Sequence, residues 1–140
     1  MTVKYKPTTK QELKELVQDE SINLGDIDTS LITDMEDLFL CENRSDWSGI
    51  ETWDVSNVTD MSRMFSCSNF KGDISNWKLK QSAEVYGMFS GCCFSDLKLP
   101  KELEFMEDFE EDEWILHRFM TRMSQRYGKH LVSKSVFYYF

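Results

Sequence analysis

The chain has 140 residues, of which 41% are hydrophobic and 14% aromatic, and its 25 acidic against 16 basic residues give a formal net charge of −9. The length suits one domain or a short repeat array with end caps, and the hydrophobic content excludes a largely disordered chain. The acidic balance argues against direct nucleic-acid binding, because neutralising phosphates requires Lys and Arg. With two histidines and no C-x-x-C motif, we expect no metal site and no cofactor.

The N-terminal sequence MTVKYKPTTKQEL has no apolar run long enough for a signal peptide, and no window of the chain approaches a membrane span. We therefore expect a cytoplasmic protein. Its partner should be another protein, with a basic surface, rather than nucleic acid or a membrane.

Residues 1–21 form a predicted N-terminal cap. Thr9 and Glu12 fit an S/T-x-x-E capping box, in which the hydroxyl accepts from a helical amide and the carboxylate reaches back to the cap amide. A helix from about Lys10 to Gln18 should come next. Its apolar face consists of Leu13, Leu16 and Val17. We expect this face to cover the hydrophobic end of the first repeat, because repeat arrays require such an end cap.

Residues 22–96 carry two to three copies of one unit. The central copy, from Trp53 to Phe70, reads WDVSNVTDMSRMFSCSNF, and a segment that starts at Ile27 matches it at an offset of 26 residues. A weaker copy comes after it, with Trp77, Met88, Phe89 and Phe94 at an offset of 24. A period near 25 predicts a stacked solenoid.

Within each copy the apolar spacing changes. Residues alternate around Trp53, as in a short strand, whereas Met61, Met64 and Phe65 recur at i, i+3 and i+4, as in one helical turn. Thr59 and Asp60 stand where they would cap that turn, and Thr33 and Asp34 are their equivalents. The sequence therefore predicts an α+β fold, a short leucine-rich-repeat-like solenoid of strand-turn-helix units of about 24–26 residues.

The recurring Met and Phe residues are interpreted as core because of their helical spacing. Trp47, Trp53 and Trp77 are also interpreted as core, with a role as binding hot spots as the alternative. Cys41 and Cys67 occupy the same repeat position, which favours a row of small buried thiols over a disulfide framework.

Units of the form W-D-V-S-N-V-T-D-M-S-x-M-F resemble those of the BspA-like leucine-rich-repeat proteins of bacteria. The opening KYKPTTKQELKELVQDESINLGDIDTS is similar to the start of many members, so the resemblance covers about residues 3–94. It implies protein–protein contact without enzymatic activity, in a family that is often surface-associated and described as adhesion proteins.

Residues 97–140 lose the repeat and are predicted to form an acidic-then-basic helix and then a terminal strand. The candidate partner-binding residues lie here. They are Glu107, Asp108, Glu110, Glu111, Asp112 and Glu113, with Tyr138 and Tyr139 in the strand. The acidic run has two interpretations: a solvated helix face that matches the helix dipole, or a negative surface that occupies a basic groove on a partner.

Catalysis finds little support, because the only histidines are His117, within the predicted helix, and His130, beside a basic turn. Asp34 and Asp60 should lie side by side, yet their position at the start of a turn explains them better than acid–base chemistry. We expect no enzyme but a protein-interaction module of the BspA-like repeat type. The alternative is a small acidic inhibitor that occupies a basic groove of a partner such as a host defence enzyme, including one that normally holds nucleic acid.

Overall fold

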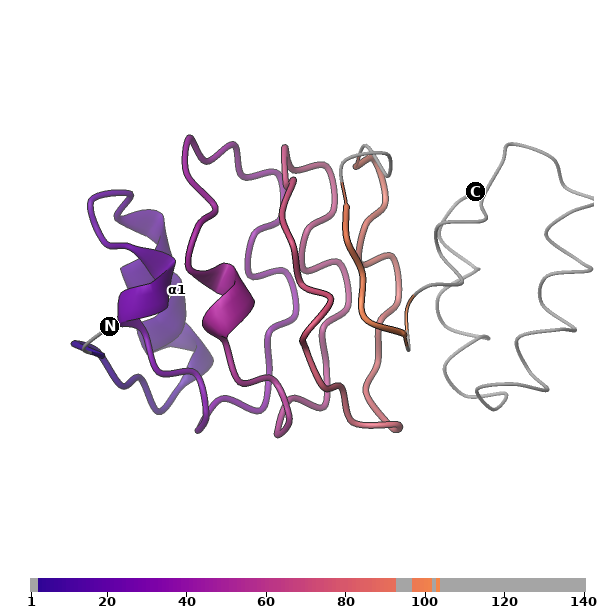
Figure 1. Cartoon of the computed structure of the whole chain (residues 1–140), viewed down its shortest axis with the longest axis horizontal. Coiled ribbons are helices and arrows are strands. Elements are labelled where there is room, and N and C mark those ends of the chain that lie inside the picture. Colours follow the sequence, from indigo (N-terminus) through magenta and orange to yellow (C-terminus); the bar gives the residue numbers. More distant parts are fainter. Residues whose placement is uncertain (1–2, 93–96, 102, 104–140) are drawn as a thin grey trace, which may run out of the picture.

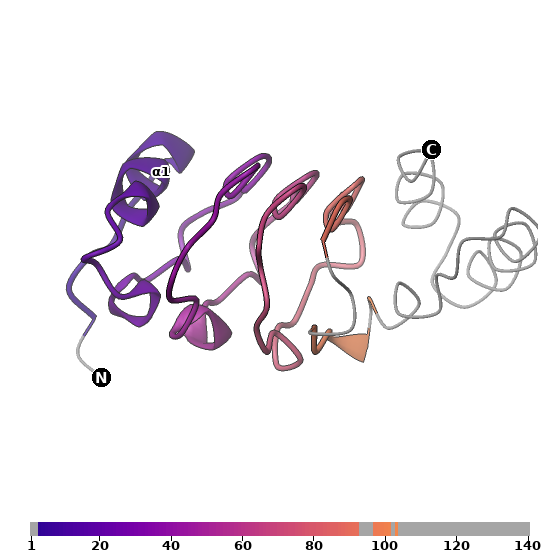
Figure 2. The ribbon, with the colours of Figure 1, turned by 90° about the horizontal axis from the view of Figure 1, so that it is seen from above.

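The structure, a computed structural model, describes residues 3–92, 97–101 and 103. In these residues the chain winds into successive coils that lie side by side along the long axis, with the helix α1 (Lys10–Gln18) at the N-terminal end (Figures 1 and 2). The short 3-10 helices η1 (Leu24–Asp26) and η2 (Ile50–Thr52) come after it. We number the coils from the equivalent residues Ile27, Trp53 and Trp77, so that coil 1 spans residues 27–52, coil 2 spans 53–76 and coil 3 begins at 77.

The equivalence rests on one turn that recurs in each coil. The amide of Ile27 donates to the Leu24 carbonyl at 3.2 Å, and the matching bonds close at Trp53, Trp77 and Leu103 at 3.1, 3.0 and 2.8 Å. Adjacent coils run parallel. Isolated parallel bridges join Tyr5 to Ile27, Asp34 to Asp60, Asp60 to Glu84 and Asp73 to Lys98.

The predicted α+β solenoid of strand-turn-helix units is wrong. Within the described residues, pairing between coils takes the form of isolated bridges rather than strands, and the segments that start at Met35 and Met61 contain turns where a helix was expected. Their spacing at i, i+3 and i+4 does bury one face, but without the i to i−4 hydrogen bonds of a helix.

The amides of these segments are used alternately for the neighbouring coil and for local turns. Four amides of coil 1 donate to carbonyls of coil 2 at 2.8 to 3.0 Å, and four amides of coil 2 donate to coil 3 at 2.7 to 2.9 Å. In coil 1 the donors are Met35, Asp37, Phe39 and Cys41, and in coil 2 they are Met61, Arg63, Phe65 and Cys67. The amides between them close three-residue turns, as from Leu38 to the Met35 carbonyl at 3.3 Å. We call this set of bonds the turn ladder.

Every fourth residue of the ladder segments has a left-handed backbone conformation, and this conformation gives the ladder its turns. Positive φ angles of 53° to 59° occur at the matching residues of coils 1 and 2, and glycines take these positions in coil 3. The residues are Asp37, Cys41, Arg63, Cys67, Gly87 and Gly91. For a residue with a Cβ this conformation costs about 1–2 kcal/mol, which the ladder bonds must offset. It also prevents a continuous α-helix.

The interior is a column of apolar side chains, as the recurring Met and Phe residues predict. Phe65 lies between Phe39 and Phe89, with ring centroids 5.6 and 5.5 Å away and planes within 6° and 3°. Met35, Met61, Met64 and Met88 are fully buried. All three tryptophans that were interpreted as core are buried as well, at 3 to 6% exposure.

Helix α1 covers the N-terminal end of this column, with the predicted bounds and with Leu13 and Val17 buried. The Thr9 hydroxyl accepts from the Glu12 amide at 3.2 Å, as a capping box requires. The Glu12 carboxylate accepts from the amide of Thr8, at 2.7 Å, and from the Thr8 hydroxyl, at 3.1 Å. None of the helices among the described residues is long and apolar enough to cross a membrane.

Arg44 fastens the other end of α1 to coil 1. Its side chain is buried, at 5% exposure, and its guanidinium donates to the Val17 carbonyl in the last turn of the helix. It also donates to the carbonyls of Ile22 at 3.5 Å and Asp46 at 3.2 Å. These three acceptors are backbone carbonyls, and a cation beside them suits the negative end of the helix dipole.

Candidate functional site

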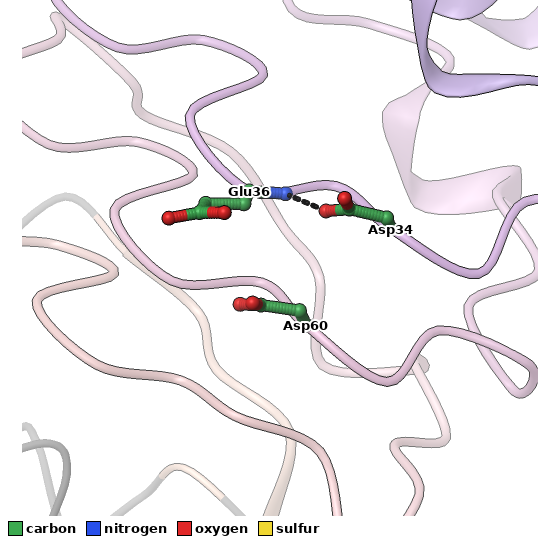
Figure 3. A group of neighbouring side chains, drawn as sticks. All are labelled: Asp34, Glu36 and Asp60. Atoms are coloured by element: carbon green, nitrogen blue, oxygen red, sulfur yellow. Dashed lines mark hydrogen bonds between the residues drawn. The ribbon is translucent and has the colours of Figure 1, made fainter.

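Three neighbouring carboxylates form a row at the start of the turn ladder, Asp34, Glu36 and Asp60, which are drawn in Figure 3. The bridge between Asp34 and Asp60 sets two acidic side chains side by side, as the repeat register predicts. Glu84 occupies the same position in coil 3. We call Asp34, Glu36 and Asp60 the carboxylate row.

Each aspartate of the row begins a turn of its own coil. Asp34 Oδ1 accepts from the Glu36 amide and Asp60 Oδ1 from the Ser62 amide, both at 2.8 Å. The predicted capping role of these aspartates is therefore present, although the capped segment is the turn ladder and not a helix. The Thr59 hydroxyl donates to the Thr33 carbonyl at 3.0 Å, so it joins two coils instead of capping.

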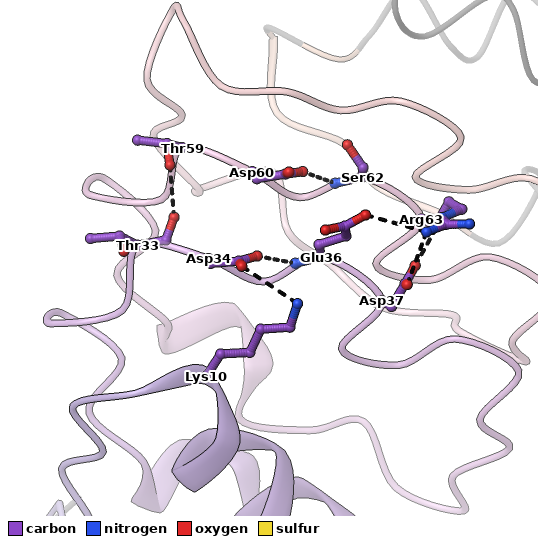
Figure 4. A network of polar contacts seen from close by, with 9 residues as sticks. All are labelled: Lys10, Thr33, Asp34, Glu36, Asp37, Thr59, Asp60, Ser62 and Arg63. Carbon is purple, nitrogen blue, oxygen red and sulfur yellow. Dashed lines mark hydrogen bonds and ion pairs between the residues drawn. The ribbon is translucent and has the colours of Figure 1, made fainter.

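Two cations neutralise part of the row, as Figure 4 shows. Lys10, at the start of α1, lies 3.5 Å from Asp34. Arg63 in coil 2 reaches back to coil 1, where it contacts Glu36 at 3.2 Å and pairs with Asp37 through two contacts of 2.9 and 3.0 Å. The Arg63–Asp37 pair has the forked geometry in which arginine binds carboxylates best.

The row has the ligand chemistry of a hard-cation site, because one oxygen from each of its three carboxylates lies within 4.8 Å of the others. These carboxylates already accept hydrogen bonds or form ion pairs within the protein, however. Turn amides, Lys10 and Arg63 account for the hydrogen bonds and ion pairs of all three side chains. Turn formation and ion pairing are thus sufficient reasons for these residues.

A second set of carboxylates lies at the corners of the coils. Asp28, Asp54 and Asp73 each accept from the amide of the serine two residues on, at 2.9 to 3.0 Å. Hydrogen bonds from that serine's hydroxyl and then its amide hold the pKa of each aspartate below its usual value of 3.8. These corner aspartates stay ionised at neutral pH and add to the negative surface.

The sequence-predicted binding residues lie outside the described residues. They are Glu107, Asp108, Glu110, Glu111, Asp112, Glu113, Tyr138 and Tyr139. His117 and His130 also lie there, so no histidine stands beside a nucleophile within the described part.

The exposure of Cys41 and Cys67 differs from the sequence prediction. Both side chains are exposed and free, so the prediction of a buried row is wrong at these two positions. The 26-residue offset correctly places Cys41 and Cys67 on adjacent coils. Their backbone is left-handed, and no residue type in the first two copies predicts that conformation. In the third copy, Gly87 and Gly91 occupy the ladder positions of Arg63 and Cys67, and this pair of glycines was the available signal.

Comparison of the sequence with known proteins assigns the chain to a protein family. A search of curated proteins and a search of solved structures returned no match. A family model described as "Mycoplasma protein of unknown function, DUF285" matches residues 10–106, which is more than half of the chain. This result gives no specific support to the BspA-like leucine-rich-repeat family. The chain belongs to the Mycoplasma protein family of unknown function DUF285.

Proposed function

We propose that this chain is a non-enzymatic protein-binding module, of the type found in BspA-like repeats. The observation that carries the proposal is the register of the carboxylate row, in which adjacent coils present acidic side chains at a fixed spacing on a firmly packed interior. Fixed charges at fixed spacing favour recognition of another surface, because little side-chain conformational freedom is lost on binding.

The charge of the surface suggests what kind of partner it fits. Along the ladder of coils 1 and 2, the carboxylates of the row and Asp37 outnumber the two cations that pair with them, Lys10 and Arg63. The whole chain carries −9. A partner with a basic patch would be steered toward this face by long-range attraction, and its affinity should fall as salt screens the charges.

A second candidate function is a small acidic inhibitor that fills a basic groove of its partner. It is favoured by the run of acidic residues between Glu102 and Glu113, together with the overall charge. In this case the carboxylate row would be a structural feature and the acidic run the binding surface.

Capture of partners from lysate of the host, at low and raised salt, tests both proposals. One variant neutralises the row, with Glu36→Gln and Asp60→Asn. A second neutralises the run at Glu107, Asp108, Glu110, Glu111, Asp112 and Glu113. A matched control, Glu15→Gln with Asp19→Asn, makes the same change of charge on α1 and its C-cap residue.

We expect the row variant to lose a partner that the control retains, in a salt-sensitive manner. Loss with the run variant alone would favour the inhibitor. A partner that survives both variants and raised salt would contradict the charge-based proposals and point to apolar contacts elsewhere on the coils. Capture of no partner by the unaltered chain would argue against a binding function.

A further inference from the structure

Two free thiols lie next to each other on the outer side of the turn ladder. Cys41 and Cys67 occupy the same ladder position in coils 1 and 2, and both side chains are exposed. The Cys41 amide donates to the Ser66 carbonyl at 2.8 Å, which sets Cys41 in register with the residue after Ser66. Neighbouring backbones paired in this manner lie about 4.8 Å apart.

The left-handed backbone brings the side chain at this ladder position against the matching residue of the preceding coil. Cys41 and Cys67 have φ angles of 56° and 54°, and Gly91, at the same position in coil 3, has 76°. A Cβ placed on Gly91 would lie 3.4 Å from Cys67 Cα and 3.2 Å from its Sγ, so at this position the Cβ points at the preceding coil. By the same geometry the Cβ of Cys67 points at Cys41. The Cys67 thiol lies close enough to contribute, after desolvation, to the raised pKa of Cys41.

We propose that Cys41 and Cys67 form a redox-active thiol pair, a modification site that a low-molecular-weight disulfide oxidises to a disulfide bond between coils 1 and 2. Disulfides join residues whose Cα atoms are about 4.4–6.8 Å apart, and the ladder spacing falls within that range. The bond needs no change of register and can form on the folded protein.

The reaction proceeds by two thiol–disulfide exchanges. The Cys67 thiolate attacks one sulfur of the reagent RS–SR, forming Cys67–S–SR and releasing RS⁻. The Cys41 thiolate then attacks the Cys67 sulfur and expels the second RS⁻. The protein loses two electrons and two protons, and the reagent is reduced to two RSH. Both thiols are exposed, so the exchange can equally begin at Cys41 and be completed by Cys67.

The fold limits the reaction to this pair among the described cysteines. Coil 3 has Gly91 at the matching position and so offers no third thiol in the row. Cys92 is partly buried, and its thiol donates to the Phe65 carbonyl at 2.8 Å. An engaged and less accessible thiol reacts more slowly.

The test treats the intact, folded chain with oxidised glutathione, blocks the remaining thiols and maps tryptic peptides by mass spectrometry. Trypsin places Cys41 in residues 15–44 and Cys67 in residues 64–71, apart from Cys92 and Cys93 in residues 81–98. We expect residues 15–44 linked to residues 64–71 as the main product, with little glutathione left on either. The oxidised chain should also melt at a higher temperature, because the link constrains the unfolded state.

Cys41→Ser removes one of the two thiols of the pair and is the key control. We expect it to keep one glutathione on Cys67 and to show no rise in melting temperature. Unaltered chain unfolded in urea should lose the preference for the link between Cys41 and Cys67. The proposal is overturned if the folded, unaltered chain retains glutathione on these two cysteines without a link, or if links to Cys92 or Cys93 predominate.

Discussion

The indole Nε1–H of Trp53 donates to the Leu24 carbonyl at 2.7 Å. A core side chain of coil 2 thus satisfies a backbone acceptor in the turn that precedes coil 1. Trp77 does the same for Ile50, at 3.0 Å. Each tryptophan therefore both fills the interior and satisfies a carbonyl of the preceding turn. That double role explains why a tryptophan, rather than another large apolar residue, suits this position.

We predict that Trp53→Phe destabilises the protein by about 1–3 kcal/mol, because the buried Leu24 carbonyl loses its indole donor. The free energy of unfolding from urea titration measures the effect. Trp47→Phe is the matched control, since its indole bonds to the side chain of Asn69, an exposed residue that water can satisfy. Equal losses for the two variants would show that volume alone matters.

Gly49→Ala should be among the most damaging substitutions of a small residue. Gly49 has a φ of 95°, and a Cβ there would lie 2.2 Å from the Gly25 amide nitrogen, a backbone atom that cannot turn aside. We expect a loss of about 3 kcal/mol or more, from strain and overpacking together. Gly91→Ala, also at positive φ but 3.2 Å from a side-chain sulfur, should cost less. Thermal unfolding of the two variants tests this order.

Replacing Arg44 by Met should destabilise the protein by about 2–4 kcal/mol. The buried Val17 carbonyl, in the last turn of α1, and the partly buried Ile22 carbonyl lose charge-assisted donors that an apolar side chain cannot replace. Arg63→Gln, which breaks a half-exposed ion pair, should cost less than about 1 kcal/mol. The two midpoints of urea unfolding give the comparison, and a greater loss for Arg63→Gln would contradict it.

Acid should destabilise the folded state through the corner aspartates. The pKa values of Asp54 and Asp73 are lowered from 3.8 by their serine partners, so their contribution is complete above that value and is lost as the pH falls through the lowered pKa. Ser56→Ala removes the hydroxyl donor of Asp54. We expect an upward shift of the Asp54 pKa in an NMR titration, with Asp73 unchanged as the internal control.

Local signals allowed part of this fold to be predicted. Helix α1 has an N-cap residue and an apolar face within nine residues, and its bounds match the prediction. The offset of 26 residues correctly set Asp34 beside Asp60, because identical residues in stacked copies meet in register. The buried Met, Phe and Trp residues were predicted from the same repetition.

The ladder segments could not be predicted in this way. Spacing at i, i+3 and i+4 indicates one buried face, and a chain of three-residue turns buries that face as well as a helix does. The two differ in the sign of φ at Arg63 and Cys67, residue types that seldom adopt a left-handed backbone. Long-range bonds to coil 3 hold them there, and the local spacing does not show such bonds; the glycines at the matching positions of coil 3 were the one signal in the sequence.

The turn ladder gives the stack an electrical direction. The four ladder amides of coil 1 that bond to another coil point to coil 2, and the four of coil 2 point to coil 3, whereas the amides of Thr59 and Glu84 point back. The peptide dipoles of these eight ladder amides, about 3.5 D each, add along the axis. The end next to α1 is the negative pole and the coil 3 end the positive one. An ammonium group is therefore favoured beside the first coil, where Lys10 already lies near Asp34, and a carboxylate beside the last.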